Sequence, residues 1–176
     1  MKSMQDTLNE RIAAKEQARL GGGPPAAEQP HTQGRLTARE RIERLVDPGT
    51  FQELDLLLTS AESELDGAAG GIPTDGVITG YAEVNGRPLF VWSQDGDVLG
   101  GSVGVIQAKK LTWLFEKALQ MRVPLVGMVD SLGERAADLV EYPHFYSLES
   151  VCQLQVAASG VIPQIVMVMG PCAGGM

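Results

Sequence analysis

The second half of the sequence repeats one plan three times: a short apolar strand pattern, a glycine-containing turn, and a helix or the place where a helix would begin. The three strand patterns cover residues 89–93, 124–129 and 164–169. Helices are expected over residues 103–121 and 135–158, the second interrupted near Pro143. Apolar strands that alternate with helices are typical of a parallel sheet, because such strands are buried under helices on both faces. The plan therefore predicts an α/β fold, with consecutive strands joined by helical crossovers.

A hairpin precedes the repeated region. Two strand patterns, at residues 76–84 and 88–94, are separated by Asn85 and Gly86. Asn-Gly is the pair favoured by a type I′ turn, because both central residues of that turn have a positive φ. We expect antiparallel pairing here, followed by parallel pairing in the rest of the sheet.

Two helical patterns lie before the hairpin. Residues 7–20 carry apolar residues at helical spacing and are followed by a glycine- and proline-rich stretch, which predicts a peripheral helix and a linker. The second helix has a T-x-x-E capping box formed by Thr37 and Glu40, and the Asp-Pro-Gly of residues 47–49 would end it.

Composition excludes several kinds of function. The chain has 22 acidic and 14 basic residues and a net charge of −8, which argues against a general surface for nucleic acid or an anionic membrane. No apolar run approaches the roughly 18 residues of a membrane-spanning helix, and the first residues lack the apolar core of a secretory signal. We therefore expect a cytoplasmic protein. Cys152 and Cys172 form no ligand pattern with the two histidines, so no metal site is expected.

The densest basic stretch of this acidic chain is residues 35–44, which contain four arginines. Such a stretch is most often a solvated helix face. It is also where a phosphorylated ligand would bind if this arm of the chain holds one. Arg39 is the candidate in this stretch for contact with a substrate.

Glycine-rich turns follow two strands that we expect to be neighbours. Gly174 and Gly175 belong to the third turn and Gly133 to the second, and a turn of this kind can present backbone N–H groups to an oxygen that gains negative charge. Phosphate binding and simple close packing are alternatives, although neither turn has the complete P-loop or dinucleotide-binding pattern. Ser131 and Ala173 lie in the same turns and are expected to contact a bound substrate.

Side-chain chemistry is less well supported. Ser93 and Ser131 lack the G-x-S-x-G pattern of a nucleophilic serine. Asp95, Asp130 and Glu134 follow strands, where a carboxylate most often caps a helix or forms a local ion pair. We assign no side chain as a general base or a nucleophile.

Seven segments carry a resemblance to a known family. They are LTARERI (36–42), DPGTF (47–51), DGVITG (75–80), SQD (93–95), GGS (100–102), ASGVIPQ (158–164) and GPCAGG (170–175). In this order they resemble the N-terminal half of the carboxyltransferase (β) subunit of biotin-dependent acyl-CoA carboxylases, of the propionyl-CoA carboxylase type. The related biotin-dependent acyl-CoA decarboxylases share these segments.

The resemblance implies a crotonase-like ββα superhelix with an N-terminal helical arm. Residues 1–35 would form the arm and its linker, and residues 36–176 the domain that holds the acyl-CoA. That domain would then be incomplete. In the family a second crotonase-like domain holds biotin, usually across a dimer interface, so the resemblance also implies an oligomer and a C-terminal carboxyltransferase half or subunit as partner.

The resemblance further implies the chemistry. In the family the carboxyl group leaves carboxybiotin as CO₂, and the biotin nitrogen takes the α-proton of the acyl thioester. The resulting enolate attacks CO₂. Gly174 and Gly175 match the family's oxyanion pair for the thioester. The implied substrate is a coenzyme A ester, propionyl- or acetyl-CoA, and biotin would be carried by a biotin carboxyl carrier protein together with biotin carboxylase.

Three functions stay open at this stage. The first is the acyl-CoA half of a carboxyltransferase that works only with a biotin-binding half. The second is a biotin-independent acyl-CoA decarboxylase, since Leu132 and Glu134 stand where the family has Gly and Ala. The third alternative is a non-catalytic subunit that binds acyl-CoA or serves assembly.

Overall fold

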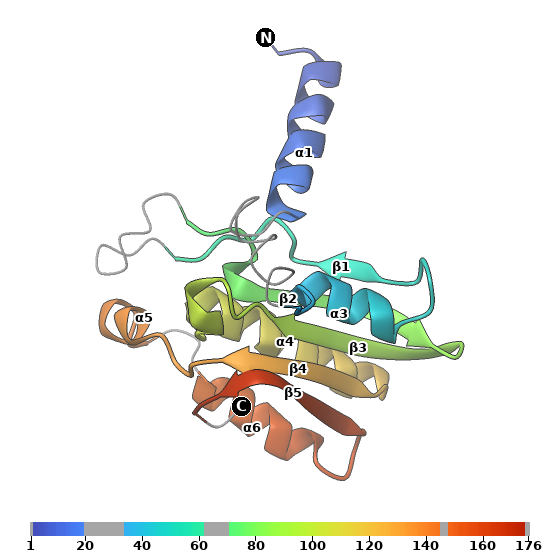
Figure 1. Ribbon diagram of the computed structural model, residues 1–176, viewed down its shortest axis with the longest axis vertical. Helices are drawn as coiled ribbons and strands as arrows, with labels where there is room; N and C mark the ends of the chain where they lie inside the picture. The colour runs from blue at the N-terminus through green and yellow to red at the C-terminus, as the bar shows by residue number, and fades with distance from the viewer. Residues whose placement is uncertain (1, 20–33, 62–70, 145–147, 175–176) are drawn as a thin grey trace.

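The computed structural model describes residues 2–19, 34–61, 71–144 and 148–174 (Figure 1). Within these ranges the chain forms a five-stranded sheet in the order β1-β2-β3-β4-β5. The strands are β1 (Gln52–Leu54), β2 (Val77–Val84), β3 (Arg87–Gln94), β4 (Leu125–Ser131) and β5 (Gln164–Cys172). The α-helices are α1 (Met4–Arg19), α3 (Ala38–Leu45), α4 (Val105–Met121), α5 (Ala136–Glu141) and α6 (Leu148–Ala158). Two 3₁₀ turns are η1 (Thr74–Gly76) and η2 (Leu99–Gly101).

The sheet changes from antiparallel to parallel pairing at β3. Strands β1, β2 and β3 are antiparallel, whereas β3, β4 and β5 are parallel. Asn85 and Gly86 have φ angles of 51° and 70°, as a type I′ turn requires. Both the predicted hairpin and the predicted α/β class are therefore confirmed.

Helices cover the two faces of the sheet, and each face has its own apolar core. Figure 1 shows α3 on one face, where Ile42 packs with Val91 and Met128. The opposite face lies against α4 and α6, and its core includes Trp92 and Leu111. This layering is what continuous apolar strands require, because both sides of each central strand must leave water.

The predicted capping box of α3 is confirmed. The Thr37 hydroxyl accepts the backbone N–H of Glu40 at 3.2 Å, and the Glu40 carboxylate accepts the backbone N–H of Thr37 at 2.9 Å. The two bonds satisfy donors that the first turn of a helix otherwise leaves unpaired. They fix the start of the helix that carries Arg39 and Arg41.

Helix α4 begins at a glycine. Gly104 is its N-cap residue and supplies no side-chain bond, so the Asp138 carboxylate accepts the N–H of Val105 at 2.7 Å instead. The predicted helix over residues 103–121 is confirmed within two residues. The helical region predicted for residues 135–158, interrupted near Pro143, is observed as α5 and α6, although residues 145–147 lie outside the described part of the chain.

Strand β5 differs from expectation in two ways. The sequence predicted that the strand ends at Met169 and that a turn begins at Gly170, but β5 continues to Cys172 around an irregularity in its pairing with β4. The strand was also expected to be buried. In the described chain it is the edge of the sheet, so Val168 is 64% exposed and Ile165 54% exposed.

The N-terminal helical arm is present as α1, which projects away from the sheet and is exposed along most of its length (Figure 1). The predicted linker falls mostly at residues 20–33, outside the described ranges. The boundary between arm and domain at residues 35 and 36 therefore stays a prediction. Among the described helices, none has the length and apolar character needed to cross a membrane.

Candidate active site

Three loops meet at the carboxyl ends of the parallel strands. The loop after β4 touches the loop after β3, since Leu132 N–H donates to Gly100 O at 3.0 Å and Val103 N–H donates to Gly133 O at 2.8 Å. The end of β5 joins them through a 3.1 Å bond from Ala173 N–H to the backbone oxygen of Ser131. In open α/β sheets this edge is where ligands usually bind.

The structure brings several of the predicted turn residues together. Gly133 has a φ of 97°, and a Cβ added to it would lie 3.5 Å from the backbone oxygen of Ala173. Gly174 follows with a φ of 76°. Gly175 lies outside the described residues. Ser131, Gly133, Ala173 and Gly174 therefore form one cluster, which we call the strand-end turns.

The amide of Gly133 is already engaged within this cluster. Its N–H donates to the Ser131 hydroxyl at 3.1 Å. A ligand oxygen that reaches this N–H would share or replace the serine oxygen. The strand-end turns can thus offer a main-chain donor and a hydroxyl to one oxygen atom. The roles assigned to these residues stay predictions.

A buried ion pair lies beneath the strand-end turns. Asp130, at 1% exposure, accepts a 2.8 Å bond from Nη2 of Arg41 and lies 3.7 Å from Nη1 of Arg35. Arg41 belongs to α3, so this pair ties the helix to the end of β4. Burial raises the pKa of the neighbouring Asp95 carboxyl above its usual value, and Arg41 opposes that rise.

The basic stretch thus behaves differently from a solvated face. Arg35 donates to Asp97 in the loop after β3, and Arg41 donates to Asp130 on β4. Arg39 forms a two-pronged ion pair with Glu53 on β1. No contact of Arg39 with the strand-end turns is seen among the described residues. Its role in substrate binding therefore stays a prediction, and a ligand phosphate would have to compete with Glu53.

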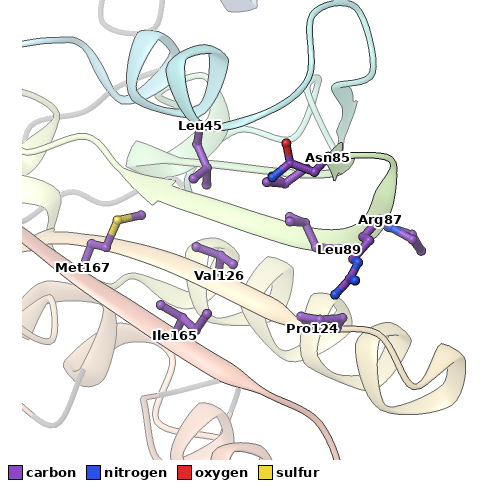
Figure 2. Close-up of a pocket in the computed structure, with 10 residues that line it drawn as sticks. Leu45, Asn85, Arg87, Leu89, Pro124, Val126, Ile165 and Met167 are labelled. Atoms are coloured by element: carbon purple, nitrogen blue, oxygen red, sulfur yellow. The ribbon is translucent and has the colours of Figure 1, made fainter.

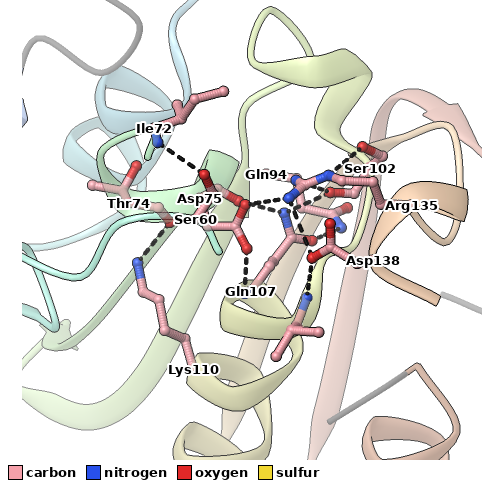
Figure 3. A network of polar contacts seen from close by, with 11 residues as sticks. Ser60, Ile72, Thr74, Asp75, Gln94, Ser102, Gln107, Lys110, Arg135 and Asp138 are labelled. Carbon is pink, nitrogen blue, oxygen red and sulfur yellow. Dashed lines mark hydrogen bonds and ion pairs between the residues drawn. The ribbon is translucent and has the colours of Figure 1, made fainter. Parts of the chain in front are cut away.

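A second polar network lies beside the site (Figure 3). The guanidinium of Arg135 contacts Asp75 at 2.7 Å and donates to the hydroxyl and backbone oxygens of Ser102. Gln107 joins the same network through two bonds to Asp75. A Cβ on Gly104 would lie 2.2 Å from Arg135 Nη1, so this glycine gives the guanidinium its space. The network therefore fixes the position of Arg135, which directly follows the turn at Gly133 and Glu134.

Burial shifts two pKa values in this network. It raises the pKa of the Asp75 carboxyl, although Arg135 acts in the opposite direction. It also lowers the pKa of Lys110 to about 8. Lys110 donates to the backbone oxygens of Thr74 at 3.1 Å and Val77 at 2.5 Å. These bonds connect α4 to η1 and to the first residue of β2, so the interactions seen here are structural.

An apolar groove of about 520 Å³ lies elsewhere on the molecule (Figure 2). Pro124 and Ile165, near the amino ends of β4 and β5, form part of its wall. The remaining lining residues are Leu45, Val84, Asn85, Arg87, Pro88, Leu89, Val126 and Met167. The groove is therefore at the opposite end of these strands from the strand-end turns, and it is separate from the candidate site.

The described ranges contain no group of three or more His, Cys, Asp or Glu residues placed to hold a metal ion. The donors that the strand-end turns present are those expected for an oxyanion: backbone amides and a hydroxyl. In a comparison with protein families, the model of the carboxyl transferase domain matches residues 29–176. The chain belongs to the carboxyl transferase family.

Curated relatives of this carboxyl transferase chain include propionyl-CoA carboxylase β chains. It is 42% identical over 175 residues to that of Roseobacter denitrificans, covering 99% of this chain and 33% of the relative. It is also 42% identical to the human mitochondrial β chain, covering 98% and 32%. Methylmalonyl-CoA decarboxylase subunit alpha of Veillonella parvula is 38% identical, covering 97% and 32%. The chain spans about a third of the length of the curated relatives it matches.

Solved structures show the same fold. Transcarboxylase 12S, with methylmalonyl-coenzyme A and methylmalonic acid bound, matches with a TM-score of 0.89 and 34% identity over 99% of this chain and 34% of that one. A single-chain, multi-domain long-chain acyl-CoA carboxylase matches with a TM-score of 0.78 and 31% identity, covering 96% and 17%. The crotonase-like fold predicted for this carboxyl transferase chain is confirmed.

Sequence reasoning missed the partners of the buried charges. It treated Arg41 as part of a solvated face and Asp130 as a helix cap or a local ion-pair partner, whereas the two bond to each other across 89 residues of sequence. It assigned no role to Asp75 as an ion-pair partner. The sequence did contain Gly96 and Gly170, which leave room for the Asp130 carboxylate. Their meaning becomes clear only when the strands are placed in space.

Proposed function

We propose that this chain is the acyl-CoA-binding part of a biotin-dependent carboxyltransferase, which moves a carboxyl group between carboxybiotin and a short acyl-CoA through an enolate. The observation that carries the proposal is the contact between the turns after β4 and β5, where Gly133 lies against Ala173. This contact occurs in a chain whose family match covers residues 29–176.

The strand-end turns would act on the thioester carbonyl. As the α-proton leaves, negative charge builds on the thioester oxygen, and N–H groups of Gly133, Gly174 and Gly175 would stabilise it. A preorganised donor of this kind lowers a barrier by about 3 kcal/mol. The hydroxyl of Ser131 would hold the N–H of Gly133 in place until the carbonyl oxygen arrives. Holding the thioester in one orientation contributes further through proximity.

The carboxyl group itself would come from carboxybiotin, carried by a biotin carboxyl carrier protein that works with biotin carboxylase. The chain's own part is to bind the CoA ester and to orient its carbonyl and α-carbon. Propionyl- and acetyl-CoA are the substrates we propose. Methylmalonyl-coenzyme A in transcarboxylase 12S supports a short acyl-CoA.

A C-terminal carboxyltransferase half is the partner we propose. The edge strand β5 leaves apolar side chains in water on both of its faces, with Ile165 54% exposed on one face and Val168 64% exposed on the other. A strand edge with this composition is a surface that a further polypeptide would cover. An oligomer is part of the proposal as well, since transcarboxylase 12S assembles as a hexamer.

The experiment is to co-express the chain with a biotin-binding carboxyltransferase half and to assay transfer from carboxybiotin to propionyl-CoA and acetyl-CoA. We expect turnover by the complex and none by the chain alone. An assembled complex without turnover would contradict the proposal. Calorimetry would then distinguish a non-catalytic subunit, which binds the CoA ester in every assembly but converts it in none.

A second candidate is decarboxylation of an acyl-CoA without biotin. It is favoured by the 38% identity to methylmalonyl-CoA decarboxylase subunit alpha and by the position of Glu134, which is exposed beside Gly133. Under this alternative the isolated chain would decarboxylate malonyl- or methylmalonyl-CoA. Glu134→Gln would abolish the reaction, while the same substitution would leave carboxybiotin-dependent transfer in place.

A further inference from the structure

Strand β5 bulges around a single side chain of β4. Val129 pairs with Val168 and Ser131 pairs with Cys172, so residues 169–171 of β5 lie opposite Asp130 alone. A bulge of this kind bends a strand and changes the direction in which it leaves the sheet. Here the bent segment leads directly to Ala173 and Gly174.

The carboxylate of Asp130 fills the bulge. A Cβ added to Gly170 would lie 2.1 Å from Oδ1 of Asp130, and one added to Gly96 would lie 2.5 Å from the same atom. A Cβ on Gly101 would lie 1.9 Å from the Asp130 backbone oxygen. Real Cβ atoms do not approach other atoms this closely. The loop after β3 and the end of β5 can therefore contact Asp130 only because these three residues are glycine.

Charge holds the carboxylate in this position. Arg41 donates to Oδ2 of Asp130 from one side, and its Nε donates to the backbone oxygen of Leu36 at 3.0 Å. Gln94 accepts the backbone N–H of Asp130 at 3.2 Å. With Arg41 at 7% exposure and Asp130 at 1%, the pair is shielded from water and its geometry is fixed by α3 and the sheet together.

We propose that Asp130, oriented by Arg41, is a positioning residue that sets the direction of both strand-end turns. The proposal rests on the function proposed above for what those turns do to a thioester. Through its backbone Asp130 leads into Ser131 and Gly133, and through its side chain it shapes the bulge that leads to Gly174. One carboxylate thus fixes the relative placement of donors that come from two strands.

The first test is independent of catalysis. Amide hydrogen exchange is measured on segments 131–135 and 172–174 of the chain, for the wild type and for Asp130→Asn. We expect faster exchange in both segments, by about 10-fold or more, because the neutral amide no longer anchors Arg41 and the bulge loosens. Unchanged exchange in either segment would overturn the proposal.

Asp47→Asn is the matched control. The Asp47 carboxylate accepts the backbone N–H groups of Asn85 and Gly86 at 3.0 and 2.8 Å, so it also ties the end of α3 to the sheet, but at the β2–β3 hairpin. The control should lose stability without faster exchange in the strand-end turns. If Asp130→Asn does not fold, Gly170→Ala disturbs the same contact from β5 and is used in its place.

The second test uses the carboxyltransferase assembled with its biotin-binding half. Asp130→Asn should lower kcat by about 30-fold with KM for propionyl-CoA changed less than about threefold, because misplaced oxyanion donors weaken the transition state more than the bound ester. Asp47→Asn should keep kcat within about twofold. A purely structural role would instead lower kcat only in proportion to the unfolded fraction. If exchange rises in the variant while the wild-type complex shows no turnover, positioning stands and the proposed function fails.

Discussion

Nη1 of Arg135 lies 2.7 Å from Oδ1 of Asp75, although 60 residues separate the two in sequence. Asp75 precedes β2 in the antiparallel part of the sheet, and Arg135 follows the turn after β4 in the parallel part. Both residues are at least 95% buried. The pair therefore connects the two parts of the sheet next to the candidate active site.

Removing one member of this pair should be costly. Among the described residues, Asp75→Ala leaves the buried Arg135 guanidinium with the Asp138 carboxylate, 3.7 Å away, as its remaining ion-pair partner. Breaking a buried pair in this way costs roughly 3–5 kcal/mol of unfolding free energy, and we expect the lower end because Asp138 compensates in part. Urea denaturation of the wild type and of Asp75→Ala measures this loss of unfolding free energy. As a control, Asp97→Ala breaks the more exposed contact with Arg35 and should cost about 1 kcal/mol or less.

Much of the fold could be predicted because its signals are local. The capping box at Thr37 and the Asn85-Gly86 turn each depend on a few neighbouring residues, and both are observed. The site was predictable only in part. The approach of Gly133 to Ala173 follows from parallel strands that end together, but the pairing of Arg41 with Asp130 depends on how α3 packs on the sheet. No sequence periodicity reports that packing.

The burial of β5 was predicted wrongly for a related reason. Its apolar residues indicate a strand buried on both faces, and that inference holds only when a further element covers the edge. In the described chain β5 has β4 on one side alone. An apolar pattern therefore specifies which surface should be buried, without specifying what buries it.

The buried amine of Lys110 should make stability depend on pH in the alkaline range. Burial lowers its pKa to about 8 in the folded chain, against about 10.5 when unfolded. Between these values the unfolded chain binds the proton and the folded chain does not, so the unfolding free energy contributed by this group rises with pH. The full rise is about 3 kcal/mol, since one pKa unit corresponds to about 1.4 kcal/mol.

Comparison with Lys110→Met isolates this effect, because methionine keeps the apolar stem and does not titrate. Urea denaturation of both proteins at several pH values between about 7.5 and 10.5 gives the difference in unfolding free energy. We expect the unfolding free energy of the wild type to increase relative to that of the variant as pH rises. A difference that is constant over this range would show that Lys110 keeps an ordinary pKa in the folded chain.

Gly127 should not accept a methyl group. It lies within β4, and an added Cβ would be 2.2 Å from Cζ2 of Trp92, a ring that is 1% exposed and has little room to move. Gly127→Ala should therefore destabilise the fold by about 1–3 kcal/mol through overpacking. Gly86→Ala provides the comparison, because nothing lies within 4 Å of its added Cβ and only its φ of 70° is strained. A smaller cost at Gly127 than at Gly86, by thermal or urea unfolding, would contradict this account.

Gly133→Ala tests the strand-end turns with little steric disturbance. The added methyl group would meet the Ala173 backbone oxygen at 3.5 Å, an ordinary contact, so the main effect is strain at a φ of 97°. Relief of that strain rotates the peptide plane that carries the Gly133 N–H. If that N–H stabilises the thioester oxygen, turnover by the assembled enzyme should fall by about 100-fold, since loss of one such donor has effects of this order.

Gly160→Ala is the matched control for this substitution. Gly160 has a φ of 74° and an added Cβ there meets nothing within 4 Å, while the residue lies between α6 and β5, at the opposite end of β5 from the turns. Both variants should lose about 1 kcal/mol of stability from a strained backbone. Only Gly133→Ala should lose turnover. If the two variants have equal kcat values in the assembled enzyme, the substitution at Gly133 has no effect beyond backbone strain. Gly133 would then not belong to the catalytic site.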